Sequence, residues 1–144
     1  MESKVYTRSA TREDLAEMLR GHGVMPTHQR MEIAHALFSR CEHLSADQVL
    51  GIVNARHAQT SKATVYNTLN LFVEKCLIRE VIVDPDRVFY DPNTTPHHHF
   101  YNVDTGELSD IDAGEVEVSR LPALPPGMVT DGIEIIVRIR ASAQ

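Results

Sequence analysis

A run of three histidines, His97-His98-His99, is the part of this 144-residue chain with the clearest chemical potential. Side chains alternate along a strand, so His97 and His99 would point to one face and His98 to the other. Two neutral imidazoles on one face can bind a metal ion. The run also lies inside the chain, whereas an engineered histidine tag is terminal. The spacing therefore favours a metal site over three solvated histidines.

Carboxylates and a further histidine are predicted to lie within reach of this run. Asp91 precedes His97 by six residues, and Asp110 follows a predicted turn that would bring it beside His97 and His99. His43, in a loop before a predicted helix cap, is a further candidate. Imidazole and carboxylate donors without a thiolate suit Fe(II), Mn(II) or Zn(II), and ligand type alone does not select among these ions.

Catalysis is the other chemistry that such a cluster offers, because histidines and carboxylates can hold a hydrolytic or oxygen-activating metal. No nucleophile motif, phosphate-binding loop or HExxH pattern lies beside the histidines, and little chain is left to enclose a substrate. A binding protein is therefore favoured over a metal-dependent hydrolase or oxygenase. We expect no enzymatic activity.

The elements that would position these residues begin with helices. Apolar spacing predicts four of them, each preceded by a Ser or Thr suited to be an N-cap. They cover residues 12–21 (cap Thr11), 28–40 (Thr27), 46–56 (Ser45, with Gln48 completing a capping box) and about 62–75 (Ser61). Strands at 78–83 and 87–90, joined by a turn, follow as a hairpin. Four helices ending in a two-stranded wing are typical of a winged helix-turn-helix.

The fourth predicted helix is the candidate for the major groove of DNA. Lys62 and the helix N-terminus can contact phosphates, whereas Tyr66 and Asn67 can reach base edges. Taken alone, this polar face is equally typical of a solvated helix, but the wing beside it favours DNA binding. The outward-facing candidates are Ser61, Lys62, Thr64, Tyr66, Asn67 and Asn70.

Residues 92–96 hold two prolines and no large apolar side chain, which predicts a hinge. We therefore expect a DNA-binding domain at 1–91 and a metal-binding dimerisation domain at 97–144. Strands are predicted in the second domain at 98–103, 107–111 and 133–139. About 50 residues with three short strands are too few to bury a core alone, so we expect a homodimer, which also suits palindromic DNA. The expected class is α+β, a winged helix-turn-helix followed by a small α/β domain.

The net charge of −6 is divided unevenly along the chain. All of the acidic excess lies in residues 85–144, so a neutral first half can approach DNA while an acidic second half suits cations. No apolar run approaches the roughly 20 residues of a membrane span, and the N-terminus does not read as a secretion signal. We therefore expect a cytoplasmic protein that does not bind membranes. Cys41 and Cys76 form no CxxC pair and are expected to be reduced core thiols.

Five sequence strings together resemble the ferric uptake regulator (Fur) superfamily. The resemblance implies a dimeric, metal-dependent DNA-binding regulator, expected to be a repressor, in which a divalent metal between the domains closes the dimer onto an AT-rich inverted repeat. The ligands that it implies fall on His43, Asp91, His97, His99 and Asp110. The strings are PTHQR (26–30), HLSADQV (43–49), SKATVYNTL (61–69), FYD (89–91) and HHH (97–99), within a likeness from about 11 to 140.

Two departures of the chain from the pattern of this superfamily concern further metal sites. Many members hold a structural zinc with two CxxC pairs, but Asn102 and Thr105 stand at the first pair here, so we expect no four-cysteine zinc. Some members carry a second, histidine-rich site. Pro96 and His98 stand at two of its positions, so that site is not carried over.

Two subgroups of the superfamily match different features. The aspartate at Asp110 is typical of peroxide-sensing regulators, in which bound Fe(II) reacts with peroxide and a histidine at the position of His43 or His97 is oxidised. The histidine triplet without CxxC, and the run LPALPPGM…IEIIVRIR, look like the iron response regulator subgroup, which responds to haem. No Cys-Pro haem motif occurs, although the triplet offers haem ligands. Iron, haem and peroxide therefore all stay open as signals, with Fe(II) or Mn(II) expected in cells and Zn(II) in purified protein.

Overall fold

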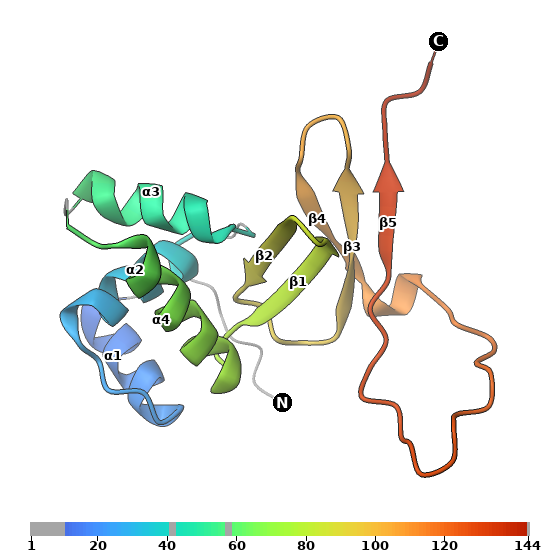
Figure 1. Cartoon of the computed structure of the whole chain (residues 1–144), viewed down its shortest axis with the longest axis horizontal. Helices are drawn as coiled ribbons and strands as arrows, with labels where there is room; N and C mark the ends of the chain where they lie inside the picture. The colour runs from blue at the N-terminus through green and yellow to red at the C-terminus, as the bar shows by residue number, and fades with distance from the viewer. Residues whose placement is uncertain (1–10, 41–42, 57–58, 144) are drawn as a thin grey trace. The chain divides into compact units, whose positions relative to one another are not determined.

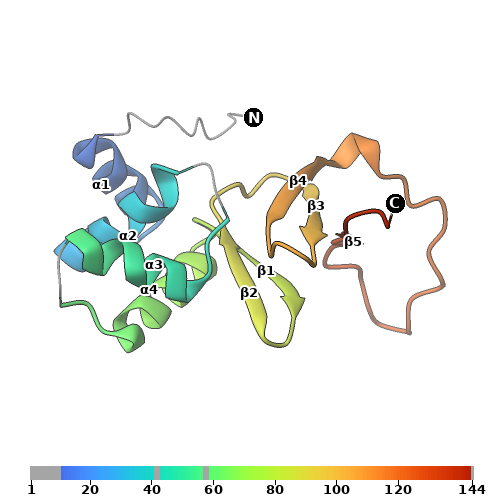
Figure 2. The same ribbon diagram turned by 90° about the horizontal axis from the view of Figure 1, so that it is seen from above.

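The computed structural model describes residues 11–40, 43–56 and 59–143, which form two compact units. The first unit ends at Thr94 and contains four helices followed by an antiparallel pair of strands; the second begins at Thr95 and contains a three-stranded sheet (Figures 1 and 2). This is the α+β class that the sequence predicts. No helix among the described residues is both long and apolar enough to cross a membrane.

The helices of the first unit begin where side-chain caps satisfy their free N–H groups. The structure has α1 at Arg12–Gly21, α2 at His28–Phe38, α3 at Ala46–Arg56 and α4 at Lys62–Glu74. Thr11 and Asp14 form a capping box at the start of α1. The hydrogen bond from the Thr11 backbone N–H, and after it the one from the Thr11 hydroxyl, lowers the pKa of Asp14. Helix α2 is two residues shorter than predicted: it ends at Phe38, and the backbone N–H and the hydroxyl of its C-cap, Ser39, both donate to the His35 carbonyl.

Apolar side chains from all four helices form the core of the first unit. Asn54 closes the turn between α3 and α4, donating to the Thr60 carbonyl at 3.2 Å and accepting the Thr60 N–H at 3.1 Å. Strands β1 (Arg79–Asp84) and β2 (Arg87–Asp91) pair antiparallel to make the wing. The innermost side chains, all without exposed surface, are Leu19, Ile33, Ala34, Leu37, Val49, Val65, Leu69, Phe72 and Leu77.

At the end of α4 the structure corrects one prediction, that Cys76 is a core thiol. Cys76 is exposed rather than buried, with a left-handed backbone at φ 62°. Its N–H donates to the Val73 carbonyl at 3.0 Å, and the N–H of Leu77 donates to the Phe72 carbonyl at 2.9 Å. These bonds form a Schellman motif, which directs Leu77 into the core and the preceding residue outward. Cys41 lies outside the described residues.

Replacing Cys76 by glycine is expected to raise the free energy of unfolding by about 0.5–1 kcal/mol, because glycine adopts a left-handed backbone without the Cβ clash. Thermal unfolding at one fixed protein concentration measures the change. Cys76→Ala is the matched control, since it removes the thiol but keeps Cβ. Equal gains in both variants would show that the thiol, not the backbone, is responsible.

The second unit is built around β3 (His97–Asn102), the central strand. It pairs antiparallel with β4 (Leu108–Asp112) and parallel with β5 (Ile136–Ile139). The fifth strand begins three residues later than predicted. The N–H of Ile135 donates to the His98 side chain instead of to a strand carbonyl, so the regular ladder starts only at Ile136. A short 3-10 turn, Ala113–Glu115, follows β4.

Asn102 organises the turn between β3 and β4. Its side-chain Oδ1 accepts the N–H groups of Asp104 and Thr105 at 2.9 and 3.2 Å, and its carbonyl accepts the N–H of Gly106 at 2.7 Å. Gly106 has φ 77°, which glycine adopts without strain. The turn thereby sets the register in which His99 faces Asp110 across the strand pair.

Asn102→Ala is expected to lower the free energy of unfolding by about 1–2 kcal/mol, because two side-chain hydrogen bonds to backbone N–H groups are removed. Asn102→Asp keeps an acceptor oxygen at the same place and is expected to retain most of the stability. Thermal unfolding of the three proteins at equal concentration tests this expectation. If the alanine and aspartate variants were destabilised alike, the acceptor role of Asn102 would be wrong.

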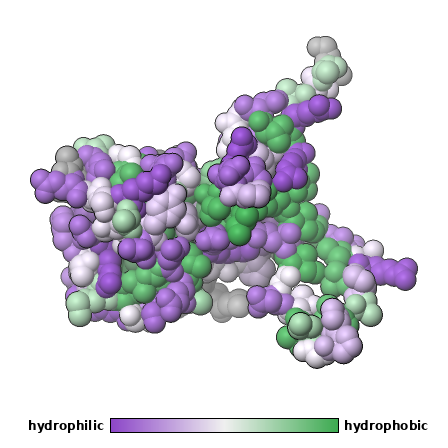
Figure 3. Space-filling view, in the orientation of Figure 1, coloured by the Kyte–Doolittle hydropathy of each residue, from purple (hydrophilic) through white to green (hydrophobic). Residues whose placement is uncertain are grey.

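Apolar side chains are exposed on the second unit to an extent that the first unit does not show (Figure 3). Soluble monomers rarely display extensive contiguous apolar surface, so this surface is suited to a protein partner. The exposed side chains are Val103, Val118, Leu121, Leu124, Met128, Val129, Ile133, Val137 and Ile139.

Candidate metal centre

In the first unit, His43 and Asp91 come together although 47 residues separate them in sequence. The residues next to them, Leu44 and Tyr90, form an antiparallel bridge with N–H to carbonyl distances of 3.3 and 2.7 Å. This bridge fixes the loop before α3 against the end of β2. His43 Nε2 then lies 3.1 Å from Asp91 Oδ2. The first unit therefore presents one imidazole and one carboxylate side by side.

Burial and hydrogen bonding hold these two side chains in place. Their exposed fractions are 11% for His43 and 4% for Asp91. The second carboxylate oxygen of Asp91 accepts the N–H of Asn93 at 2.9 Å. Burial, more than the neighbouring Glu80 and Tyr66, raises the pKa of Tyr90, so its phenol stays neutral at physiological pH.

In the second unit, His97, His99 and Asp110 converge on one face of the sheet. The Nε2 atoms of both histidines lie 3.5 Å from Asp110 Oδ1, and their ring centroids are 4.5 Å apart. One ligand atom from each of the three residues lies within 4.8 Å of the others. Both imidazoles are almost fully buried, whereas the Asp110 side chain is 47% exposed. A small ion can therefore reach the cluster from the Asp110 side.

The chemistry of these donors fits a divalent metal. Two imidazoles and one carboxylate form the facial triad that binds Fe(II), and the same atoms suit Mn(II) and Zn(II). His97 Nδ1 lies 2.6 Å from the Thr95 carbonyl, so that nitrogen carries the proton and Nε2 is the nitrogen available to an ion. Taking two imidazoles out of water beside a carboxylate is otherwise costly, and a bound cation offsets that cost.

His98 points to the opposite face of β3, as strand alternation requires. Its Nδ1 accepts the N–H of Ile135 at 3.1 Å, so the ring is the neutral tautomer with its proton on Nε2. This bond joins the central strand to the segment before β5. His98 thus has a structural role that the sequence does not predict.

Glu134 is the residue of this region that the sequence did not single out. Its Oε1 lies 3.6 Å from His99 Nδ1. Only the parallel pairing of β5 with β3 brings it there, and no local pattern in the sequence marks that pairing.

The candidate DNA-contacting residues lie along one side of α4. Ser61, Lys62, Tyr66 and Asn67 are exposed, and Thr64 is half-buried. Ser61 Oγ accepts the N–H of Thr64 at 3.1 Å and lies 2.9 Å from the Thr64 hydroxyl, so both hydroxyls also serve the helix cap. The opposite side of the helix, with Val65, Thr68, Leu69 and Phe72, is buried.

Lys62 holds its ammonium group 3.4 Å from Asp47 and 5.8 Å from the centre of the Tyr66 ring. Because Lys62 and Asp47 are 62% and 72% exposed, this ion pair contributes little stability, about 0–1 kcal/mol. The lysine can therefore exchange the carboxylate for a phosphate at small cost.

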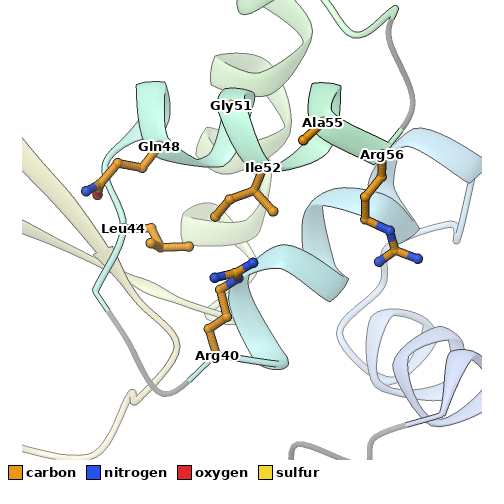
Figure 4. Close-up of a pocket in the computed structure, with 7 residues that line it drawn as sticks. All are labelled: Arg40, Leu44, Gln48, Gly51, Ile52, Ala55 and Arg56. Atoms are coloured by element: carbon orange, nitrogen blue, oxygen red, sulfur yellow. The ribbon is translucent and has the colours of Figure 1, made fainter.

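A shallow pocket of about 470 Å³ lies beside α3 (Figure 4). Gly51, Ile52 and Ala55 line one side of it, and Arg40 reaches in from the segment after α2. The remaining lining residues are Leu44, Gln48 and Arg56. No carboxylate, imidazole or thiol is among them, so this pocket has no group suited to acid–base or nucleophilic catalysis.

Comparison with known proteins agrees with this combination of features. Residues 21–124 match the model of the ferric uptake regulator family. The peroxide-responsive repressor PerR of Staphylococcus aureus is 29% identical over 110 residues, which cover 76% of this chain and 74% of that protein.

Solved structures show the same fold. The ferric uptake regulator of Pseudomonas aeruginosa with manganese has a TM-score of 0.67 at 24% identity, covering 88% of this chain and 97% of that one. The ferric uptake regulator of Francisella tularensis with iron has a TM-score of 0.69 at 23% identity, covering 83% and 92%.

Proposed function

Because the chain belongs to the ferric uptake regulator family, whose members are metal-dependent DNA-binding regulators, we propose that it represses transcription when a divalent ion is bound. The observation that carries this proposal is the cluster of the second unit, in which two buried imidazoles and a carboxylate converge within 4.8 Å. The proposed ligands are His43, Asp91, His97, His99 and Asp110.

Donor count supports a single ion shared by the two units. The three donors of the second unit leave coordination positions open on Fe(II) or Mn(II). His43 and Asp91 add one nitrogen and one oxygen donor of the same chemical kind. Six peptide steps separate Asp91 from His97, so their Cα atoms can be no more than roughly 20 Å apart in any arrangement.

Such a site would couple metal binding to DNA binding. Ligands drawn from both units restrict how the DNA-reading unit can be placed, and a bound ion thereby favours arrangements in which α4 can enter the groove. The gain in DNA affinity is set by how much more tightly the ion binds the arrangements in which α4 can enter the groove than the other arrangements. Such coupling is typically about 5–150-fold. Loss of the ion removes that gain.

Members of this family bind DNA as dimers, and the exposed apolar side chains of the second unit offer the surface for a second copy. In a two-fold dimer, α4 of each protomer would face one half of an inverted repeat. We propose an AT-rich inverted repeat as the operator. Lys62 and the N-terminus of α4 would contact phosphates, and Tyr66 and Asn67 would contact base edges.

For the signal we favour iron or haem supply, with Fe(II) or Mn(II) as the ion in cells. Two observations support peroxide as an alternative: the carboxylate beside His97 and His99 is an aspartate, and the Staphylococcus aureus relative is named a peroxide-responsive repressor. Adding one equivalent of peroxide to the Fe(II) protein separates the two. A gain of one oxygen on the peptide of His43 or His97 supports peroxide sensing. An unmodified mass together with a haem Soret band supports haem sensing.

The function itself is tested by selecting duplexes from a random library with the Mn(II)-loaded protein and then titrating the recovered duplex. Fluorescence anisotropy is expected to show tighter binding with Mn(II) by about 5–150-fold, reversed by a chelator. Affinity should also fall steeply with salt, because phosphate contacts release counterions. Equal DNA affinity with and without metal would contradict the proposal.

A further inference from the structure

We propose that Glu134 is the positioning residue of His99: its carboxylate accepts a hydrogen bond from the Nδ1–H of the imidazole and so leaves the Nε2 lone pair for the metal. The inference rests on the metal site proposed above and adds to it a residue that lies outside the five ligands.

The two nitrogens of His99 face different carboxylates. Nε2 is 3.5 Å from Asp110 Oδ1, and Nδ1 is 3.6 Å from Glu134 Oε1. A neutral imidazole has one N–H donor and one acceptor nitrogen. If Nδ1 carries the proton toward Glu134, the lone pair of Nε2 is left for the ion beside Asp110. The opposite tautomer would direct an N–H at the metal position and weaken binding.

The backbone around Glu134 is held in place by the strand that carries His99. The N–H of His99 donates to the Ile135 carbonyl at 3.1 Å, and the N–H of Ile135 donates to His98 Nδ1 at 3.1 Å. Both bonds join Ile135 to β3 and set the segment just before β5 in register. Glu134 therefore reaches His99 from an anchored position rather than from a free loop.

Burial strengthens the electrostatic interaction between Glu134 and His99. The side chain of His99 has no exposed surface, and that of Glu134 is only 30% exposed. Solvent screens this pair less than it screens an exposed ion pair. The separation of 3.6 Å is slightly longer than a hydrogen bond, so the proposal requires the Glu134 side chain to move closer to the ring when the ion binds.

The two buried histidines then differ in their outer partners. His97 Nδ1 lies against the backbone carbonyl of Thr95 at 2.6 Å, whereas His99 Nδ1 faces a carboxylate. A carboxylate partner raises the basicity of a ligating imidazole. His99 is thus the stronger donor of the pair, and loss of Glu134 weakens the site through it.

The test compares the full-length protein with Glu134→Ala, Glu134→Gln and the control Glu107→Gln, an exposed glutamate at the other end of the β3–β4 hairpin. Mn(II) affinity is read from the EPR signal of the free ion, and the His99 tautomer from long-range ¹H–¹⁵N NMR of the Zn(II) form. Glu134→Ala is expected to weaken Mn(II) binding about 10–100-fold. Glu134→Gln, which keeps an acceptor oxygen, should lose less, and the control should bind as the parent does. The parent should show the proton of His99 on Nδ1.

His99→Ala separates this inference from the proposal beneath it. If His99→Ala leaves Mn(II) affinity unchanged, the metal site itself is wrong. If His99→Ala loses binding while Glu134→Ala matches the parent, or if Nδ1 of His99 carries no proton in the Zn(II) form, only the role of Glu134 is overturned.

Discussion

His99→Ala is expected to abolish the response of DNA binding to Mn(II). The substitution removes a fully buried imidazole, a proposed ligand 3.5 Å from the Asp110 carboxylate, and its cost should exceed the roughly 10–100-fold loss of metal affinity typical when an outer partner is removed. At Mn(II) concentrations that saturate the parent, the variant should bind the selected duplex as weakly as the metal-free parent does. Anisotropy titrations with and without Mn(II) measure the difference.

His22→Gln is a matched control for His99→Ala. His22 follows α1, where its Nδ1 lies 2.9 Å from the Met18 carbonyl, and glutamine retains a group able to make that contact. The control should keep the full response to Mn(II). A His99→Ala protein that still gained DNA affinity on adding Mn(II) would place the regulatory ion elsewhere.

Asn67→Ala is expected to weaken DNA binding by about 1–3 kcal/mol for each half-site, because alanine cannot hydrogen-bond to a base edge. A dimer on an inverted repeat is weakened in both half-sites, which makes the combined effect one of the largest expected for the molecule. Discrimination among operator sequences should fall along with affinity. Asn67 is exposed on α4 and packs into no core, so folding should be unaffected.

Lys62→Ala tests the phosphate contacts of the same helix. It should reduce the slope of log affinity against log salt by about one for each phosphate that the lysine neutralises, with little effect on sequence preference. Lys75→Ala, an exposed lysine at the opposite end of α4, is the control for net charge. If the two lysine variants had equal slopes of log affinity against log salt, α4 would not contact the phosphates through Lys62.

The sequence predicts the elements of the first unit well because their determinants are local. Thr11, Thr27 and Ser61 begin helices through contacts three residues away, and apolar spacing marks the buried side of each helix. Departures arise where a local contact changes the outcome, as at Ser39, which ends α2, and at Cys76, which occupies a left-handed cap that usually takes glycine.

The proposed metal donors of the second unit also lie within local reach, because one hairpin brings Asp110 opposite His99. His43 is a candidate from its place before a helix cap, and the family resemblance strengthens it. Local patterns alone do not pair it with Asp91, because the bridge between Leu44 and Tyr90 that sets the two side by side is a long-range contact. The place of Glu134 beside His99 is also set by a long-range contact. Parallel pairing between β3 and β5 joins residues far apart in the chain, and alternation along a strand gives no information about which partner it will take.

A Co(II) titration followed by visible absorption tests most directly the central claim, that donors from both units hold one ion. Co(II) lies between Fe(II) and Zn(II) in ligand preference and reports its coordination in its spectrum. The parent should reach a plateau at one ion per chain, and His43→Ala and His99→Ala should each weaken that same transition. Two transitions, each abolished in only one variant, or a His43→Ala titration that matches the parent, would contradict the claim.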